Sequence, residues 1–536
     1  MTTHSASMLA SGGLGSPVSA FLLVTCCAFF LCLVIGVRDA DDRTADFFAA
    51  DRSLPMVQNA LAMSGDYILV TSLSAPVGMI ALNGYDGLVA AACAVTGLVM
   101  LALLAEPLRN TGQFTLGGVL ERRTPGSRVR IAGGVVTLVV CVPLTVVQLT
   151  VAGHAISFLL GLHGSGSALA CTVMIGLLMI TFAAFGGMRG SSMLAAGKAL
   201  LLFAVLAAAA LVVVRRFDWS LGALLSAAAQ GSGRGDAFGT SGLLFGASST
   251  GRLEFISVCL AVTLGSSVLP MMLMRVSASR NGRSSRRSVR HATLYQVLFW
   301  GVLVVLGLGA AALVGGAAIG ASDATGNTAL LMLSAQISGG REGLMFTFLS
   351  CAVFLASLGS VAGLTLAGAA SLVRDVIARE RLRVWVSEGR EVATARWTVV
   401  GLGVMSVLLA VVLHQWRLVF LVSFAVTVAA SVILPTLLKT LFGRGVTRTG
   451  TLWSLYGGLA CCIVLQLGSP TVSGTPTALF PDLDFQWFPL QNIGVVTVPV
   501  GFLLAWAGSR FSRRAATDGA DHAASEVRTL TGIDIT

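Results

Sequence analysis

Charged residues are scarce in this chain: only 11% of its 536 residues are Asp, Glu, Lys or Arg, whereas 55% are hydrophobic. A soluble protein of this length could not bury so much apolar surface in one core. The longest polar stretches, 217–252 and the tail after Arg510, are too short to hold cores of their own. The sequence also lacks a phosphate-binding glycine-rich loop with its lysine, and nothing arranges Ser, His and Asp as a nucleophilic triad. These absences argue against an enzyme and indicate an energy source other than ATP.

Long apolar runs are abundant instead. We count thirteen runs, each long enough to cross a hydrocarbon core of about 30 Å as a helix. The runs are continuous and rich in Leu, Ala and Val, which favours helices over the alternating strands of a membrane barrel. The predicted spans lie near residues 16–37, 54–82, 87–107, 128–160, 165–186, 191–215, 253–276, 290–319, 341–373, 395–413, 416–442, 450–468 and 488–508. We therefore expect an all-α polytopic membrane protein.

The net charge of +11 reflects topology. If the N-terminus is outside, 28 of the 35 Lys and Arg residues fall on the cytoplasmic side and six outside, so the positive-inside rule predicts N-out and C-in. Arg275 is counted among the cytoplasmic loop residues, as is a cluster for which we expect a solvated loop, with contact to anionic lipid as the alternative: Arg280, Arg283, Arg286, Arg287 and Arg290. The first run lacks a basic flank before it and is followed by Arg38, which predicts a retained span rather than a cleaved signal peptide. All ten cysteines lie inside apolar runs without metal-ligand spacing, which indicates core packing.

The spans predict a single membrane domain with internal repeats. Transporters of this size commonly consist of inverted five-helix repeats whose first helices are interrupted in mid-membrane. Two segments, 62–67 and 265–270, combine Gly, Ser or Pro within apolar helices five spans apart, where freed carbonyls and amides can face a ligand. The predicted organisation is an extracytoplasmic segment 1–15, a membrane domain 16–508 and a cytoplasmic tail 509–536. The membrane domain divides into a peripheral helix 16–37, a first repeat 54–215, a second repeat 253–442 and two last helices in 450–508.

Several stretches carry a resemblance to a known family. They are NALAMSGDYILVTSL and NGYDGL in 59–88, AEPLRNTGQFTL (105–116), QLTVAG (148–153), FAAFGGMRG (182–190), GSSVLPMMLMR (265–275), SVAGLTLAGAASLVRD (360–375), AVTVAASVILP (425–435) and ALFP (478–481). In this order, across roughly residues 45–510, they resemble the sodium/solute symporter family and within it the acetate permease branch. The resemblance implies a LeuT-like core with extra helices at both ends. It also implies inward movement of an organic anion with a co-transported cation.

The resemblance places a cation site on named residues. In the family, carbonyls of the interrupted second span and oxygens of the ninth span hold sodium. These positions match the carbonyls of Gly65, Ile68 and Ala356 and two hydroxyl positions, Gly359 and Ser360. Gly359 has no hydroxyl, so the site offers one oxygen fewer than the family pattern, whereas a hard cation takes about five or six. Sodium and a proton both remain open as the coupling ion, with the proton favoured.

Two charged residues inside the spans bear on this choice. Lys198 is about 10 Å inside the sixth span, a depth at which a lysine is costly enough to indicate function. The resemblance places Ala195, one turn away, where sodium-coupled members keep an acidic residue. Lys198 would then couple proton movement, as an amine near the sodium position is thought to do in some transporters of this architecture. Alternatively it is a snorkelling lysine. Asp66, in the first interruption, would relay protons or help to hold a cation.

An anionic substrate is better bound by helix N-termini and neutral hydrogen-bond donors than by a carboxylate, which would repel it. The candidates are Ser266 and Ser267 beside the second interruption, Tyr67 beside the first, and Gln148 in the fourth span. The alternative for the serines is close packing of small residues between helices. For Gln148 the alternative is an interhelical hydrogen bond.

Three functions stay open at this point. The first is a symporter in a bacterial cytoplasmic membrane for acetate or anions of the size of propionate, pyruvate or glycolate, driven by a proton or sodium gradient and needing no other cofactor. The second is a symporter of the same family for an amino acid or sugar. The third is a membrane sensor that has lost transport, although the tail after Arg510 is too short for a signalling domain. We expect the lipid bilayer and a small monocarboxylate as partners, and neither nucleic acid nor an obligatory protein.

Overall fold

The computed structural model describes residues 44–512 except 160–164, 324, 341–342, 378–387, 415–417, 444 and 476–477, together with residues 527, 529 and 531. This part of the chain is nearly all helical, and β-type pairing within it is confined to two isolated bridges. The predicted first span 16–37, the segment 1–15 and most of the predicted tail lie outside the described residues.

Apolar helices dominate the described part. The helices are α3 (Thr44–Ala49), η1 (Ala50–Arg52), α4 (Met56–Tyr67), α5 (Val70–Asn83), α6 (Tyr85–Asn110), α7 (Leu116–Arg123), α8 (Ser127–Leu159), α9 (Ser165–Arg216), α10 (Leu221–Gly231), η2 (Gly235–Gly239), α11 (Ser249–Ser266), α12 (Pro270–Ser277), α13 (Gly282–Leu313), α14 (Gly316–Ser322), α15 (Ala329–Ser338), α16 (Leu344–Ser371), η3 (Leu372–Ile377), α17 (Glu388–Val412), α18 (Leu418–Val428), η4 (Ala429–Ile433), α19 (Leu434–Phe442), α20 (Arg448–Leu452), η5 (Trp453–Gly457), α21 (Gly458–Leu467) and α22 (Gly494–Phe511). Among the described residues, ten helical segments are long and apolar enough to cross a membrane, or eleven when the bent pair α4–α5 is counted as one span. The chain is therefore a multi-span membrane protein.

The helix α9 contains two of the predicted spans, 165–186 and 191–215. Its 52 residues would extend about 78 Å if straight, far more than a hydrocarbon core of about 30 Å. The backbone is non-helical at Gly187, with φ 53° and ψ −158°, a conformation open to glycine. An added Cβ at this position would also lie 3.2 Å from the ring of Phe47. The bend at Gly187 thus allows α9 to supply two passages.

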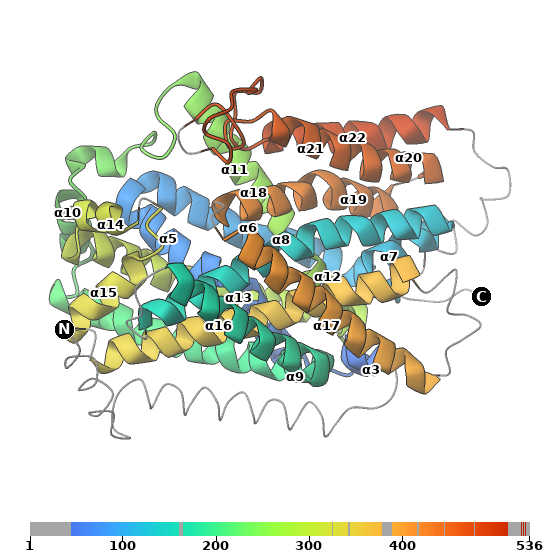
Figure 1. Ribbon diagram of the computed structural model, residues 1–536, viewed down its shortest axis with the longest axis horizontal. Coiled ribbons are helices and arrows are strands. Elements are labelled where there is room, and N and C mark those ends of the chain that lie inside the picture. The colour runs from blue at the N-terminus through green and yellow to red at the C-terminus, as the bar shows by residue number, and fades with distance from the viewer. Residues whose placement is uncertain are drawn as a thin grey trace.

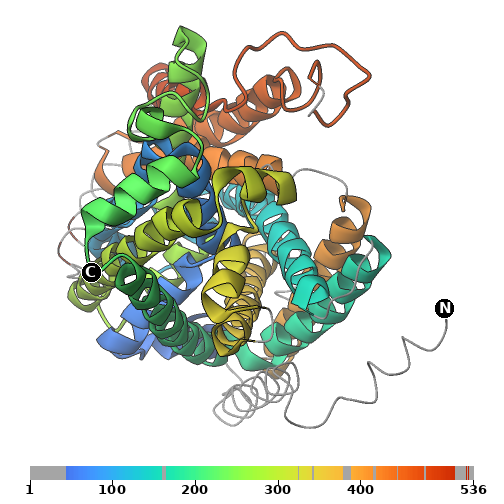
Figure 2. The same cartoon turned by 90° about the vertical axis from the view of Figure 1, so that its left-hand side faces the viewer.

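The short connecting helices lie at the two ends of the molecule. Figure 1 shows the long helices side by side, with α10, α14 and α15 at one end and α7 at the other. Figure 2 looks onto the first of these ends and shows a packed bundle with the C-terminal helices, coloured orange to red, at its rim. At the same end, the carboxylate of Asp86 holds the loop before α11 by accepting N–H bonds from Gly242 (3.0 Å) and Leu244 (2.9 Å). Tertiary hydrogen bonds therefore fix the position of this loop.

The helix α16 lies at the centre of the bundle, where it packs against α4, α8, α9 and α12. Its length and apolar sequence suit burial on all sides. Two glycines on this helix, Gly359 and Gly363, lie against side chains of α9 and α4. Close packing of small residues is the usual way in which membrane helices approach one another. Both broken helices, α4–α5 and α11–α12, surround this centre.

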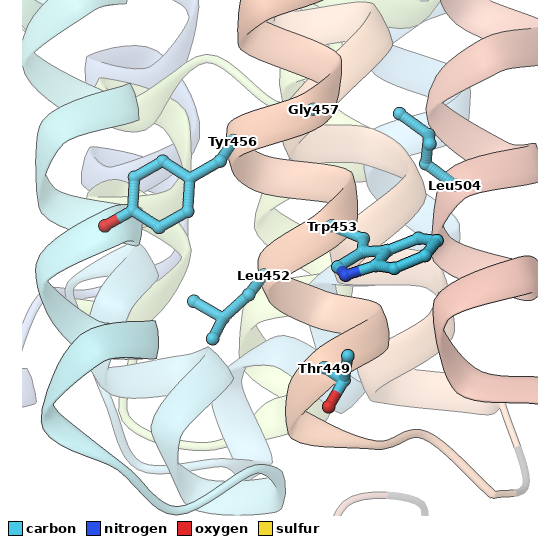
Figure 3. A pocket seen from close by; sticks show the side chains of 6 residues that line it. All are labelled: Thr449, Leu452, Trp453, Tyr456, Gly457 and Leu504. Carbon is cyan, nitrogen blue, oxygen red and sulfur yellow. The ribbon is translucent and has the colours of Figure 1, made fainter. Parts of the chain in front are cut away.

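A hollow at the rim is separate from the helix breaks. It is lined by Thr449, Leu452, Trp453, Tyr456, Gly457 and Leu504 (Figure 3). Trp453 and Tyr456 are each 48% exposed, as expected for aromatic residues on a surface that faces lipid. None of the predicted site residues lines this hollow.

Candidate transport site

The second predicted span is interrupted. The helix α4 ends at Tyr67, α5 begins at Val70, and the two axes differ by 60°. Between them, Ile68 leaves the helical conformation with ψ 85°, and Leu69 is extended with ψ 157°. The carbonyl of Ile68 and the first N–H groups of α5 are thereby free of the helical ladder. This break provides peptide groups outside the helical hydrogen-bond ladder, as the sequence predicted.

The position of this break corrects the prediction. Residues 62–67, expected to be interrupted, are helical. Gly65 has a different role, because an added Cβ there would overlap the carbonyl oxygen of Ala195 on α9. Gly65 therefore allows α4 and α9 to approach closely. The helix is interrupted after it, at Ile68.

The seventh predicted span is interrupted within the predicted segment 265–270. The helix α11 ends at Ser266 and α12 begins at Pro270. Proline is the first residue of α12, where a missing N–H costs no helical bond and the fixed φ suits the helix start. The two halves of the span are thus joined by Ser267, Val268 and Leu269 in mid-span.

Gln148 reaches the first break from α8. Its Oε1 accepts a hydrogen bond from the Val70 N–H at the start of α5, at 3.0 Å. The side chain is fully buried, and its Nε2 has no hydrogen-bond partner among the described residues. A buried amide without its partner costs about 1–3 kcal/mol. The free donor lies beside a helix N-terminus, an arrangement that suits a carboxylate.

The other three predicted substrate contacts face elsewhere. The Tyr67 hydroxyl donates to the carbonyl of Ala94 on α6. Ser266 lies against Gly97 of the same helix, where an added Cβ would overlap its Oγ. Ser267 donates to the Leu264 carbonyl of its own helix at 2.6 Å. In this conformation Tyr67 and Ser266 therefore contact α6, whereas the Ser267 hydroxyl bonds within its own helix.

Lys198 lies beside residues of the predicted cation site. Its Nζ donates to the Ala356 carbonyl and to Ser360 Oγ, each at 2.9 Å. Ser360 Oγ in turn lies 3.3 Å from the carbonyl oxygen of Ile68, across the first break. The lysine is buried at 2% exposure, so it does not snorkel to the surface. An added Cβ at Gly359 would lie 3.1 Å from Lys198 Cδ, so the glycine gives this side chain room.

Asp66 forms a buried ion pair with Arg275. The Nε of Arg275 lies 2.6 Å from Asp66 Oδ2, and each side chain is only 1% exposed. The remaining guanidinium nitrogens donate to the hydroxyls of Ser192 and Ser191 on α9, the latter at 2.9 Å. Asp66 Oδ1 has no partner within the described part of the chain. Arg275 was expected in a cytoplasmic loop, and this expectation was wrong because α12 continues through the arginine inside the bundle.

The sodium:solute symporter family model matches residues 47–458 of the chain. The chain belongs to this family. It is 33% identical, over 98% of its length and 97% of the relative, to a protein of Corynebacterium glutamicum named monocarboxylic acid transporter. It is also 33% identical, over 91% of its length and 93% of the relative, to an uncharacterized symporter of Bacillus subtilis, YwcA.

Solved transporters share the fold at low sequence identity. A sodium-coupled sialic acid symporter in a substrate-bound, outward-open state aligns with a TM-score of 0.71 and 12% identity, covering 92% of this chain and 98% of the other. The nucleobase-cation-symport-1 family transporter Mhp1 aligns with a TM-score of 0.53 and 14% identity, covering 89% and 98%. This sodium:solute symporter family member therefore has a LeuT-like fold and is a transporter of small solutes, not an enzyme.

The structure brings together the oxygens at three of the five positions that the resemblance assigns to sodium. Ile68, Ala356 and Ser360 converge, and the amine of Lys198 bonds to two of them. The carbonyl-bearing residue Gly65 lies one turn before the break. The Lys198 amine thus lies beside oxygens that the resemblance assigns to a cation.

Sequence reasoning missed Arg275 as a site residue. Its positive charge was grouped with the arginines that follow it, because the helix end could not be located from composition. The available signal was the position of Arg275 close behind the predicted break. Residues 270–277 form a short helix directly after this break, and all of them are buried. An arginine buried in such a helix requires a partner, and Asp66 was the acidic residue already singled out at the other break.

Proposed function

We propose that this family member imports a short monocarboxylate such as acetate together with a proton, across a bacterial cytoplasmic membrane. The substrate class is supported by the 33% identity, over nearly the whole chain, to a relative named monocarboxylic acid transporter. The helix breaks support alternating access around a mid-membrane site, because broken helices in this fold surround the ligand. Symport is also physically sufficient, since one elementary charge moving through 100 mV supplies about 2.3 kcal/mol.

The observation that carries proton coupling is the position of the Lys198 amine. Bonds to the Ala356 carbonyl and Ser360 Oγ give Nζ the neighbours that a sodium ion would take. A protonated amine supplies the positive charge of the missing ion and can exchange its proton, whereas a fixed sodium site would need the hydroxyl that Gly359 lacks. Lys198 is thus the proposed coupling group, with Gly65, Asp66, Ile68, Ala356 and Ser360 around it.

For the substrate, the proposed anchor is Gln148 with the N-terminus of α5. The free Nε2 of Gln148 and the N–H groups that follow Val70 in the first turn of α5 are donors beside the break. A carboxylate gains from both the hydrogen bonds and the positive end of the helix dipole. Tyr67, Ser266 and Ser267 would contact the substrate after the neighbouring helices move.

The test imposes sodium and pH gradients separately on proteoliposomes that contain the purified protein. We expect an inward proton gradient to suffice for accumulation of labelled acetate, and Lys198→Ala to abolish it. Lys439→Ala is the matched control, because the chain has one other lysine, whose Nζ donates to the Ala505 carbonyl at 2.7 Å in the peripheral helices. We expect this control variant to accumulate acetate.

Strict sodium dependence with full activity of Lys198→Ala would contradict proton coupling. Parallel uptake of labelled proline and glucose tests the other solutes of the family, and accumulation of either without acetate uptake would replace the substrate. Because the liposomes contain this protein as the sole polypeptide, acetate accumulation would exclude a purely signalling role.

A further inference from the structure

The pairing of Asp66 with Arg275 leaves the carboxylate incompletely bonded. Arginine and carboxylate usually form two parallel hydrogen bonds, which add energy and fix geometry. Here the carboxylate receives one bond, from Nε, while its second oxygen is buried without a partner among the described residues. The rest of the guanidinium is held by the hydroxyls of Ser191 and Ser192. A fully buried ion pair is costly in a membrane protein, and a purely structural pair gains from better bonding than this.

The location of the pair is also specific. Asp66 lies two residues before the break at Ile68, and Arg275 lies five residues after Pro270, which starts α12. The ion pair therefore joins the two helical halves, α4 and α12, that meet on one side of the breaks. Gly363 of α16 lies under the carboxylate, because an added Cβ there would be 3.2 Å from Asp66 Oδ2. A glycine thus lies against the carboxylate that faces the arginine.

We propose that Arg275 is a binding residue for the substrate carboxylate, and that Asp66 holds this place in the substrate-free conformation. The inference deepens the proposed function and rests on it. Acetate and the Asp66 side chain present the same carboxylate to the guanidinium, so one can replace the other at little net cost. Ser191 and Ser192 keep the guanidinium oriented during the exchange. The site takes short monocarboxylates, which pass from the donors around Gln148 to Arg275 as α4 and α12 separate.

The exchange explains why the pair is weakly bonded. A bidentate Asp66–Arg275 pair would compete too well with a small anion that gains no other contacts at the arginine. A single bond leaves the substrate able to displace the aspartate, and α4 is then no longer tied to α12. Substrate binding and separation of the two helical halves are thereby the same event.

The test measures exchange of labelled for unlabelled acetate in proteoliposomes without any ion gradient. Asp66→Asn keeps the shape of the side chain and removes the competing charge, so we expect the half-saturating acetate concentration to fall about tenfold. Arg275→Gln should abolish exchange. The double variant Asp66→Asn/Arg275→Gln contains no unpaired buried charge, and we expect it to be folded, as judged by monodisperse elution and thermal unfolding, yet inactive. Arg123→Gln is the matched control for a buried arginine, because Arg123 bonds to the Thr440 carbonyl away from the breaks; it should exchange acetate normally.

A structural ion pair predicts different results. Removing one partner would then leave an unpaired buried charge, so Asp66→Asn would lose stability and gain no affinity, while the neutral double variant would exchange acetate with the affinity of the unmodified protein. Either result overturns the inference. If the double variant does not fold, the half-saturating acetate concentration of Asp66→Asn alone distinguishes the two explanations: a fall supports substrate binding by Arg275, and no fall contradicts it. Failure of the unmodified protein to exchange acetate, propionate, pyruvate or glycolate would instead refute the proposed function.

Discussion

At the scale of residues, glycines set where the charged side chains lie. An added Cβ at Gly359 would lie 3.5 Å from Lys198 Nζ, and one at Gly363 would lie 3.4 Å from Asp66 Oδ1. The two glycines are four residues apart on α16 and so share one face of the helix. Glycine at position 359 therefore has two effects. It removes a hydroxyl ligand for sodium, and it provides the space in which the Lys198 side chain lies.

A substitution at Gly65 tests the packing of α4 on α9. Gly65→Ala would force the Cβ into the Ala195 carbonyl oxygen, a backbone atom that cannot rotate away, and we expect a loss of about 1–3 kcal/mol from overpacking. Thermal unfolding in detergent should show a lower midpoint. Gly301→Ala on α13 is the matched control, because nothing lies within 4 Å of the added Cβ, and its midpoint should not fall. Equal midpoints for both variants would contradict the close packing described for Gly65.

At the scale of elements, the two broken helices obtain their interruptions differently. The break before α12 is encoded locally, since Pro270 starts the second half and cannot continue the helix of the first. The break before α5 has no proline at the same place. It depends instead on Gln148, which caps the Val70 N–H from another helix, and on Ser360, whose Oγ lies 3.3 Å from the Ile68 carbonyl oxygen. Tertiary hydrogen bonds thus replace the helical ones.

Gln148 therefore has two separable roles, a cap and a substrate donor. We expect Gln148→Leu to raise the half-saturating acetate concentration about tenfold, equivalent to about 1.4 kcal/mol, in gradient-free exchange. Gln296→Leu is the matched control, because Gln296 is equally buried and donates to the Ser64 carbonyl at 2.9 Å; it should lower thermal stability without this change in half-saturation. If Gln148→Leu likewise affects stability alone, the glutamine is an interhelical hydrogen bond and not a substrate contact.

At the scale of the whole molecule, the short helices of predicted outer loops lie at one end and α7 of a predicted cytoplasmic loop at the other (Figure 1). For α7 and α10 to lie at opposite ends, the chain between them must cross the bundle an odd number of times. The helix α8 and the two passages of α9 supply three crossings. The bilayer orientation remains a prediction from charge: most arginines are expected on the cytoplasmic side.

Cysteine labelling tests this orientation. Ser241→Cys lies in the exposed loop before α11, and Arg283→Cys is exposed near the start of α13 at the opposite end. A membrane-impermeant maleimide should label the first in intact cells and the second only after permeabilisation. The unmodified chain, whose seven described cysteines lie in or against the spans, gives the background. The reverse pattern would show that the N-terminus is inside.

The apolar runs, their interruptions and the motif order were sufficient to predict the fold class, the family and most of the residues around the breaks. Lengths and composition determine these features because a bilayer imposes one requirement on every span, an apolar helix of sufficient length. Lys198, Gln148 and Asp66 were identified for the same reason, since polar residues are rare and expensive at such positions.

Only the tertiary structure decided which polar groups meet. The approach of Lys198 to Ala356 and Ser360, and of Arg275 to Asp66, joins residues 158, 162 and 209 positions apart in the chain. The exact start of the first break also depended on packing, because Gly65 serves contact with α9 rather than helix breaking. Hydropathy says which segments enter the membrane, but it contains no information on the rotation of each helix about its axis. That rotation sets the partner of every buried charge, and it is fixed by side-chain packing among all the helices at once.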